Sequence, residues 1–205
     1  MGRTQGRADC PLGVKGSDVN HRPIVKGMAK KTPRVLTARV THLEMNARPH
    51  RSLPVPSRPR SALLHAENMA VHFYRYLYEQ VGREHHWYLR RVMSDDDLEA
   101  ILDAETTALA VLYADGCPSG FYELDMSSLP EAVELAYFGI MPDYQGLGLG
   151  KWFLNAAIQH AWDLNPRKVT VHTNSLDHPA ALGLYQKMGF SPVAVSEETV
   201  TEWDA

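Results

Sequence analysis

The stretch Phe138-Gly139-Ile140-Met141-Pro142-Asp143-Tyr144-Gln145-Gly146-Leu147-Gly148-Leu149-Gly150-Lys151 decides the fold, because it joins a strand to a helix through a glycine-rich turn. Three glycines, at positions 146, 148 and 150, alternate within five residues. Glycines let successive backbone N–H groups turn toward one point, and the helix N-terminus adds partial positive charge. One glycine would suffice for a plain turn, so the pattern predicts a phosphate or pyrophosphate site.

The spacing argues against two common phosphate-binding motifs. In a Walker P-loop counted back from Gly150, Gln145 stands where the first glycine belongs, and Trp152 replaces the hydroxyl that binds Mg²⁺. A dinucleotide fingerprint needs Gly-x-Gly-x-x-Gly early in a parallel β-α-β unit, whereas here Gly-x-Gly-x-Gly follows a run of antiparallel-type strands. The anion is therefore held by a different motif.

The flanking sequence predicts alternating strands and helices. Period-two and β-branched segments predict strands at 35–45, 61–65, 107–113, 120–126, 132–140, 168–173 and 190–195. Apolar residues at helical spacing predict helices after Asn68, after Ser94, from Gly148 and over 179–188. Asn68 and Ser94 are the expected N-caps of the first two helices.

Two segments together carry a family resemblance. Gln145, Gly148 and Gly150 fill the pattern Gln/Arg-x-x-Gly-x-Gly/Ala, and the segment from Asp177 ends in Tyr185, three residues, then Gly-Phe. On these motifs the chain resembles the GNAT superfamily of N-acetyltransferases. The resemblance covers roughly residues 61 to 200 and is specific over 132–191.

The resemblance implies an α+β (α/β) fold with a mixed, mostly antiparallel central sheet. The sheet would be flanked by helices and splayed between the family's fourth and fifth strands, here 132–140 and 168–173. Acetyl-CoA, the co-substrate, would lie in that gap, with its pantetheine arm paired to the backbone of Gly139 and Ile140. Its pyrophosphate would bind the N–H groups of Gln145, Gly146, Leu147, Gly148, Leu149, Gly150 and Lys151. His178 stands where the family often has an asparagine, so it either contacts the cofactor or caps the following helix.

The implied reaction is acetyl transfer to a primary amine by direct attack on the thioester. An alkylamine of pKa about 10.4 is about three units from neutral at physiological pH, which costs about 4 kcal/mol, so a base is expected. Tyr185 holds the position of the family's general-acid tyrosine, and Glu134 that of a catalytic glutamate eleven residues before Gln145. Glu134 could instead face solvent, which leaves Glu123 or a water as the base. The aromatic residues in and after the first helix pack the core or border the acceptor groove: Tyr74, Tyr76, Tyr78, Trp87 and Tyr88.

Charge divides the chain in two. Residues 1–34 carry eight basic and two acidic residues, without periodicity or aromatics, and are expected to form a disordered basic arm. Residues 35–205, the expected acetyltransferase domain, keep 13 basic and 22 acidic residues, a charge of −9. That charge disfavours nucleic acid and favours a cationic small-molecule or peptide amine.

Several further expectations concern cofactors and location. The ten histidines show no metal-ligand spacing, so no metal is expected. The chain shows no signal or membrane-spanning pattern, so a cytoplasmic protein that binds no membrane is expected. Dimers are common in the family, which leaves a homodimer open. A non-catalytic acyl-CoA-binding or regulatory module on the same fold is the alternative function.

Overall fold

The computed structural model describes residues 34–50 and 52–202, so the expected basic arm lies outside the described residues except for Arg34. The strands are β1 (Val35–Met45), β2 (Ser61–Ala66), β3 (Thr107–Ala114), β4 (Cys117–Asp125), β5 (Val133–Ile140), β6 (Val169–Asn174) and β7 (Ser191–Thr201). The α-helices are α1 (Val71–Gly82), α2 (Leu89–Val92), α3 (Asp95–Leu102), α4 (Leu149–Asp163) and α5 (Ala181–Lys187). Two 3₁₀ turns, η1 (Arg83–His85) and η2 (Pro142–Tyr144), follow α1 and β5.

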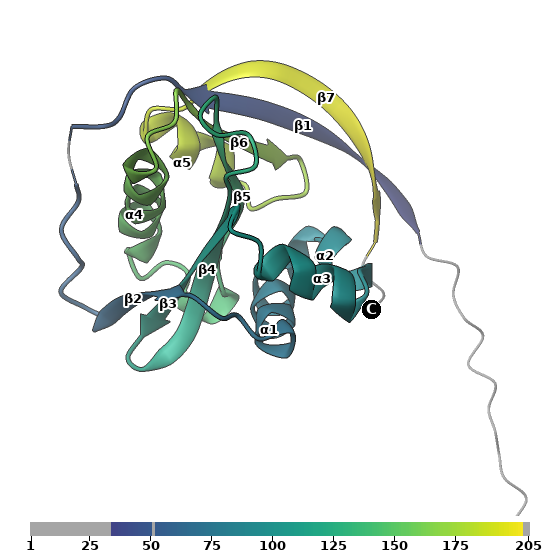
Figure 1. Cartoon of the computed structure of the whole chain (residues 1–205), viewed down its shortest axis with the longest axis horizontal. Helices are drawn as coiled ribbons and strands as arrows, with labels where there is room; N and C mark the ends of the chain where they lie inside the picture. The colour runs from purple at the N-terminus through teal and green to yellow at the C-terminus, as the bar shows by residue number, and fades with distance from the viewer. Residues whose placement is uncertain (1–33, 51, 203–205) are drawn as a thin grey trace, which may run out of the picture. The chain divides into compact units, whose positions relative to one another are not determined.

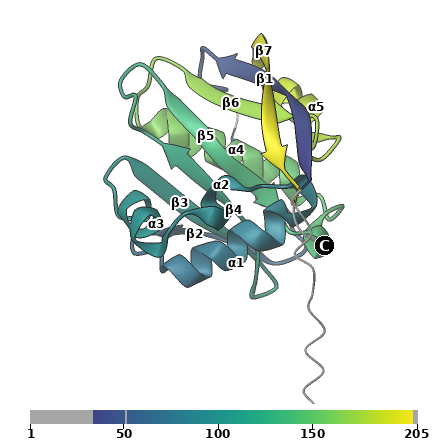
Figure 2. The ribbon, with the colours of Figure 1, turned by 90° about the vertical axis from the view of Figure 1, so that its right-hand side faces the viewer.

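The seven strands form one mixed sheet in the order β2-β3-β4-β5-β6-β1-β7 (Figures 1 and 2). Only β5 and β6 pair in parallel, and the other pairings are antiparallel. Helices α4 and α5 cover one face and α1 to α3 the other (Figure 2). This arrangement confirms the mixed, mostly antiparallel α/β fold.

The first strand lies inside the sheet, between β6 and β7. Val40 of β1 is opposite both Asn174 of β6 and Ser196 of β7. The proline-rich link that follows crosses α4, where the Leu53 N–H donates to Asn155 Oδ1 at 2.7 Å. This crossing carries the chain to β2, at the opposite edge of the sheet.

Each face of the sheet has its own hydrophobic core. On the α4 side, Tyr122, Phe153 and Ile158 are at most 1% exposed. On the α1 side, Tyr74, Leu98 and Phe121 are fully buried. The sheet is thus covered on both faces around β4 and β5, the strands that lead to the glycine-rich turn.

The helix starts match the sequence expectation in one case and not in the other. The Ser94 hydroxyl accepts from the Asp97 N–H at 3.1 Å, which confirms it as the N-cap of α3. The prediction for Asn68 was wrong, because α1 begins after Ala70 with no side-chain cap. Two helical turns after α1, η1 and α2, were not predicted.

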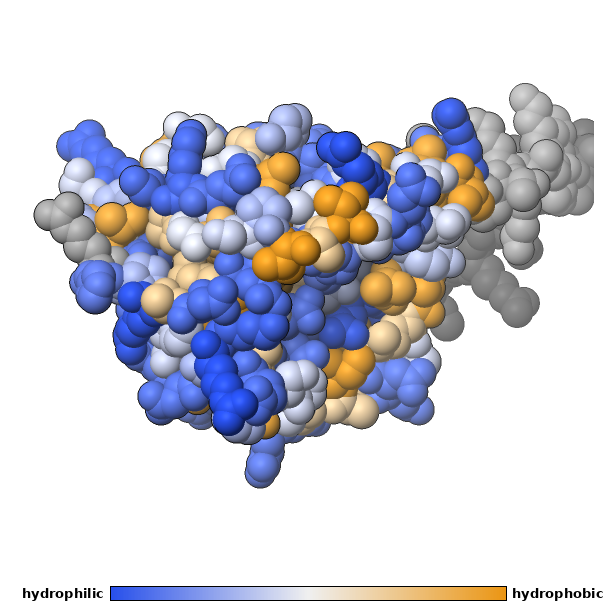
Figure 3. All heavy atoms as spheres, turned by 90° about the horizontal axis from the view of Figure 1, so that it is seen from above, coloured by the Kyte–Doolittle hydropathy of each residue, from blue (hydrophilic) through white to orange (hydrophobic). Residues whose placement is uncertain are grey.

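The outer strand β7 is largely exposed, with Val193 and Val195 55% and 62% accessible. Seen from above, the side on which β1 and β7 lie is mainly hydrophilic, with separate hydrophobic patches (Figure 3). No helix of the described residues is long and apolar enough to cross a membrane.

Candidate active site

Strands β5 and β6 pair over only two positions and then separate. Val133 is opposite Val169 and Glu134 is opposite Thr170, after which no pairing continues. On its other side, β5 pairs with β4, and the register of this pairing shifts once. Glu123 of β4 is opposite Tyr137, whereas the next residue, Leu124, is opposite Leu135, so Ala136 of β5 has no partner in β4. Such a bulge bends the strand that carries it. The separation opens a cavity of about 440 Å³ that the second half of β5, β6 and α5 line.

The glycine-rich turn forms one end of this cavity. Gly146 and Gly148 have φ of +74° and +78°, a conformation that only glycine adopts without strain. Gly150 is helical, and a Cβ there would meet no atom closer than 3.8 Å, so packing within the protein does not require this glycine. The missing Cβ leaves room for a ligand close to the backbone.

The start of α4 is suited to an anion. Among the described residues no side chain caps this helix, and its first turn holds Lys151 but no acidic residue. A lysine at the positive end of a helix is unfavourable on its own, and a bound anion would compensate both charges. Gln145 Nε2 donates to the Ile140 carbonyl at 3.1 Å, which ties the turn to the end of β5. These features fit the pyrophosphate of a coenzyme.

Gly139 is explained by packing. A Cβ at this position would lie 2.1 Å from Val81 Cγ1, so α1 can lie against β5 only if residue 139 is glycine. Gly139 nevertheless lines the cavity together with Ile140.

Tyr185 lies on α5 and faces the cavity from the α4 side of the sheet. Its ring is 7% exposed and packs edge-on against Phe138 and Phe190, with centroids 6.5 and 5.9 Å away. Burial, with a smaller effect of the Asp177 carboxylate, raises the pKa of Tyr185 far above its usual value of 10. The hydroxyl therefore keeps its proton throughout the physiological range.

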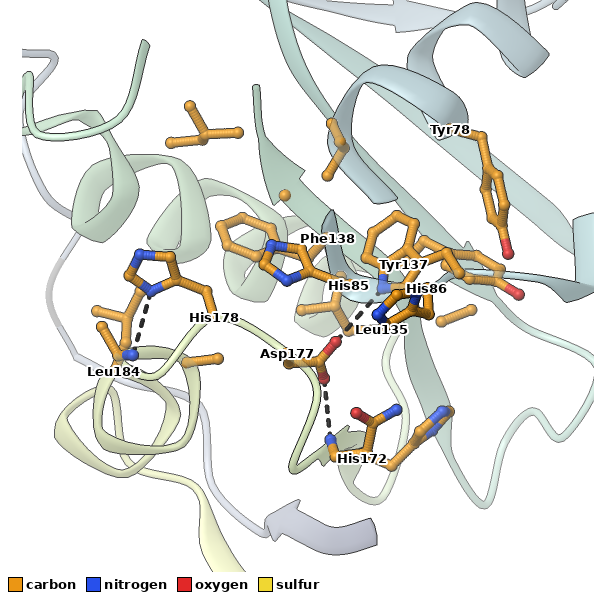
Figure 4. Close-up of a pocket in the computed structure, with 18 of the residues that line it drawn as sticks. Tyr78, His85, His86, Leu135, Tyr137, Phe138, His172, Asp177, His178 and Leu184 are labelled. Atoms are coloured by element: carbon orange, nitrogen blue, oxygen red, sulfur yellow. Dashed lines mark hydrogen bonds between the residues drawn. The ribbon is translucent and has the colours of Figure 1, made fainter. Parts of the chain in front are cut away.

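His178 lies at the start of the same segment. Its Nδ1 accepts from the Ala180 N–H at 3.1 Å, and its ring reaches the cavity wall (Figure 4). This bond lies in the turn before α5, whereas the helix itself begins after Ala180 with no side-chain cap. A contact of His178 to the cofactor stays a prediction.

The two candidate carboxylates occupy different surroundings. Glu123 is 1% exposed on the α1 side, where it accepts from the Tyr74 hydroxyl and forms an ion pair with Arg90 at 2.6 Å. Glu134 is 39% exposed, and its Oε1 lies 2.8 Å from Nδ1 of His172. Of the two carboxylates and their three partners, only His172 lines the cavity.

Three further cavity residues were not predicted as functional: His172, Asp177 and Glu198. Asp177 accepts from Trp87 Nε1 at 3.3 Å, which joins the β6–α5 loop to the segment after α1 (Figure 4). Glu198 of β7 accepts from Asn174 Nδ2 at 3.0 Å. No local signal could have found them, because they come together only through the placement of β6 and β7.

The part of the cavity wall next to Asp177 is aromatic. Tyr78, Trp87 and Tyr137 lie with ring centroids 5.1 to 5.3 Å apart, and all three line the cavity. This part of the cavity combines apolar rings with carboxylates and imidazoles. Within residues 34–50 and 52–202, no group of three or more His, Cys, Asp or Glu side chains could hold a metal ion.

Comparison with known proteins adds a family and a fold. The model of the acetyltransferase (GNAT) family matches residues 66–190. A mycothiol acetyltransferase of Paenarthrobacter aurescens is 41% identical over 61 residues, which cover 30% of this chain and 19% of that protein. The match spans about a fifth of the length of such curated relatives.

Solved structures share the fold at low sequence identity. The ribosomal-protein-S18-alanine N-acetyltransferase from Escherichia coli matches with a TM-score of 0.54 and 16% identity, over 71% of this chain and 96% of that one. A tandem GNAT protein from the clavulanic acid biosynthesis pathway matches with a TM-score of 0.59 and 13% identity, over 82% of this chain and 55% of that one.

Proposed function

The chain belongs to the acetyltransferase (GNAT) family, and we propose that it transfers the acetyl group of acetyl-CoA to a primary amine by direct attack on the thioester. The observation that carries this proposal is the gap between β5 and β6. The glycine-rich turn lies at one end of this gap, and the strands last pair at Glu134 at the other. Ile140 lies six positions after Glu134 along β5, a span of about 20 Å that suits an extended coenzyme arm.

The donor half of the site is built from backbone. The N–H groups of residues 146–151 would hold the pyrophosphate, with Lys151 as an additional charge. The N–H of Gln145, expected to take part, already donates to the Pro142 carbonyl at 3.1 Å. The backbone of Gly139 and Ile140, both of which line the cavity, would pair with the amides of the pantetheine arm. Acetyl-CoA supplies an acetyl group already activated as a thioester, so the protein needs to position it and manage protons.

Tyr185 and Glu134 are proposed to manage those protons. Removing a proton from an alkylammonium costs about 4 kcal/mol at neutral pH, and the Glu134 carboxylate is the expected acceptor. Because burial raises the pKa of Tyr185, complete loss of its proton is unfavourable. The hydroxyl would therefore stabilise the leaving thiolate as a hydrogen-bond donor, and any proton that it gave up would be replaced from the amine nitrogen.

The acceptor half of the cavity favours a small cationic amine with an apolar body. Asp177 and Glu198 attract a cation, and the rings of Tyr78, Trp87 and Tyr137 offer apolar and cation–π contacts. A mycothiol acetyltransferase among the relatives supports a small-molecule acceptor. A peptide amine is the second candidate.

A binding and thiol-release experiment tests this function. Acetyl-CoA should raise the melting temperature of the full chain, and spermidine, kanamycin, Nα-acetyl-lysine methyl ester or a peptide with a free α-amino group should then release thiol. Gly148→Val should reduce the acetyl-CoA shift, whereas Gly116→Val, in a positive-φ turn outside the cavity, should not. Absence of a shift would refute the coenzyme site. A shift without thiol release from any amine would support the non-catalytic module instead.

A further inference from the structure

Glu134 and His172 form a pair at the point where β5 and β6 separate. Glu134 is opposite Thr170 in the last paired position, and His172 lies two residues beyond Thr170. Because side chains alternate along a strand, His172 lies on the same face as Thr170. Its Nδ1 is 2.8 Å from Glu134 Oε1, and its ring lines the cavity whereas Glu134 does not. The imidazole thus connects the carboxylate with the cavity, near the residues labelled in Figure 4.

The groups around His172 come from four elements. Glu134 of β5 accepts its hydrogen bond, Glu198 of β7 and Asp177 of the β6–α5 loop add negative charge, and the His42 ring of β1 lies 6.2 Å away. The hydrogen bond to Glu134 and the three carboxylates raise the pKa of His172 above 6.5, against the effect of burial. A base whose pKa is near the working pH is most effective.

The hydrogen bond also decides which nitrogen is available. A carboxylate accepts a hydrogen bond, so the neutral imidazole keeps its proton on Nδ1 and leaves the Nε2 lone pair for another donor. A carboxylate that orients a histidine in this way is a positioning residue.

We propose that His172 accepts the proton of the substrate ammonium and that Glu134 positions the ring for this step. The inference rests on the proposed acetyl transfer and refines its base. The N–H bond of the ammonium breaks, a new N–H bond forms at His172 Nε2, and the electron pair left on the amine attacks the thioester carbonyl. His172 becomes an imidazolium paired with Glu134 and loses its proton to solvent, to which its side chain is 44% exposed.

A surface ion pair without a catalytic role is the competing explanation. Both side chains are more than a third exposed, and such pairs contribute little to stability. That explanation predicts little effect on turnover and none on its pH dependence, so pH profiles separate the two.

The test compares His172→Gln, Glu134→Gln and the control His65→Gln with the wild-type chain. His65 is exposed on β2 and does not line the cavity between β5 and β6. The acceptor is the amine from the thiol-release experiment that releases most thiol with the wild type. With this acceptor, His172→Gln should lower kcat about 100-fold or more at pH 7. It should leave the KM for acetyl-CoA unchanged and abolish the fall of kcat/KM toward low pH. Glu134→Gln should move that fall to lower pH, and His65→Gln should change nothing.

The outcomes separate this inference from the proposed function. Wild-type turnover with an unaltered pH profile in His172→Gln would overturn the role of His172 alone. Lack of thiol release by the wild type would overturn acetyl transfer, and the role of His172 with it. An NMR titration gives a second readout that needs no acceptor: the pKa of His172 should fall in Glu134→Gln, and an unchanged value would overturn the positioning role of Glu134.

Discussion

Replacing Arg90 by Met should destabilise the protein much more than removing an exposed arginine. The Arg90 and Glu123 side chains are 17% and 2% exposed, with Nη2 and Oε1 2.6 Å apart. The substitution leaves the Glu123 carboxylate buried and without its ion-pair partner, while the Tyr74 hydroxyl still donates to it. Breaking a buried pair from one side costs about 3–5 kcal/mol. At about 2–4 °C per kcal/mol for a chain of this size, the melting temperature should fall by about 6–20 °C.

The matched control is Arg167→Met. Arg167 and Glu131 form an ion pair of similar length, but their side chains are 73% and 62% exposed, so the expected loss is about 0–1 kcal/mol. Urea and thermal unfolding followed by circular dichroism measure both variants. Equal losses in the two variants would refute the conclusion that Glu123 is held in a buried structural pair. If that conclusion is right, Glu123 is unavailable as the base, which leaves Glu134 with its partner His172, or a water.

Three other predictions concern Gly150, Tyr185 and His160, which lie on the α4 side of the sheet. Gly150→Ala should stabilise the ligand-free protein by about 0.5–1 kcal/mol, because alanine suits a helix better than glycine. It should also reduce the rise in melting temperature that acetyl-CoA causes. An undiminished rise would show that no ligand approaches this position. Tyr185→Phe should lower kcat about 10- to 100-fold and leave the KM for acetyl-CoA unchanged. The reason is the loss of a hydrogen bond to a charged group, which is worth about 1.5–3 kcal/mol. Equal turnover of variant and wild type in steady-state thiol assays would exclude the tyrosine from the reaction. Burial, and then His65, lower the pKa of His160 below 6.5. As the pH falls below 6.5, His160 therefore takes up a proton more readily in the unfolded chain than in the folded protein. The wild type should then lose stability relative to His160→Gln, which the midpoints of urea unfolding at pH 7.5 and 5.0 would detect.

Local sequence patterns could predict most of the helices and strands, but not which strands pair with one another in the sheet. The strands from Thr107 to Ile140 and the helix after Gly148 were predictable, because periodicity and glycines reflect local backbone geometry. The position of β1 was not predictable, because its pairs join residues more than 120 positions apart, such as Val40 and Asn174. The prediction of Asn68 as an N-cap failed because α1 begins at Val71, two residues later than a helix capped by Asn68 would begin.

The candidate site likewise has a part that the sequence could predict and a part that it could not. The turn at Gly146 and Gly148 was predictable, since its glycines adopt the positive φ that the pattern implies. The contact between Glu134 and His172 was not, because it depends on the register of two parallel strands 38 residues apart in the chain. The burial of Glu123 also depends on packing, through an arginine from a short helix that sequence reasoning missed.

The pairing of β1 with β7 has a consequence for the order of the chain. Val35 lies opposite Thr201, and the Glu202 N–H donates to the Arg34 carbonyl at 2.8 Å, so the first and last described strands end side by side. A short linker could therefore join residues 34 and 202, and new termini could be opened in the exposed turn at Asp115–Gly116. Such a circular permutant would keep every strand pairing of the sheet, and with it both walls of the cavity.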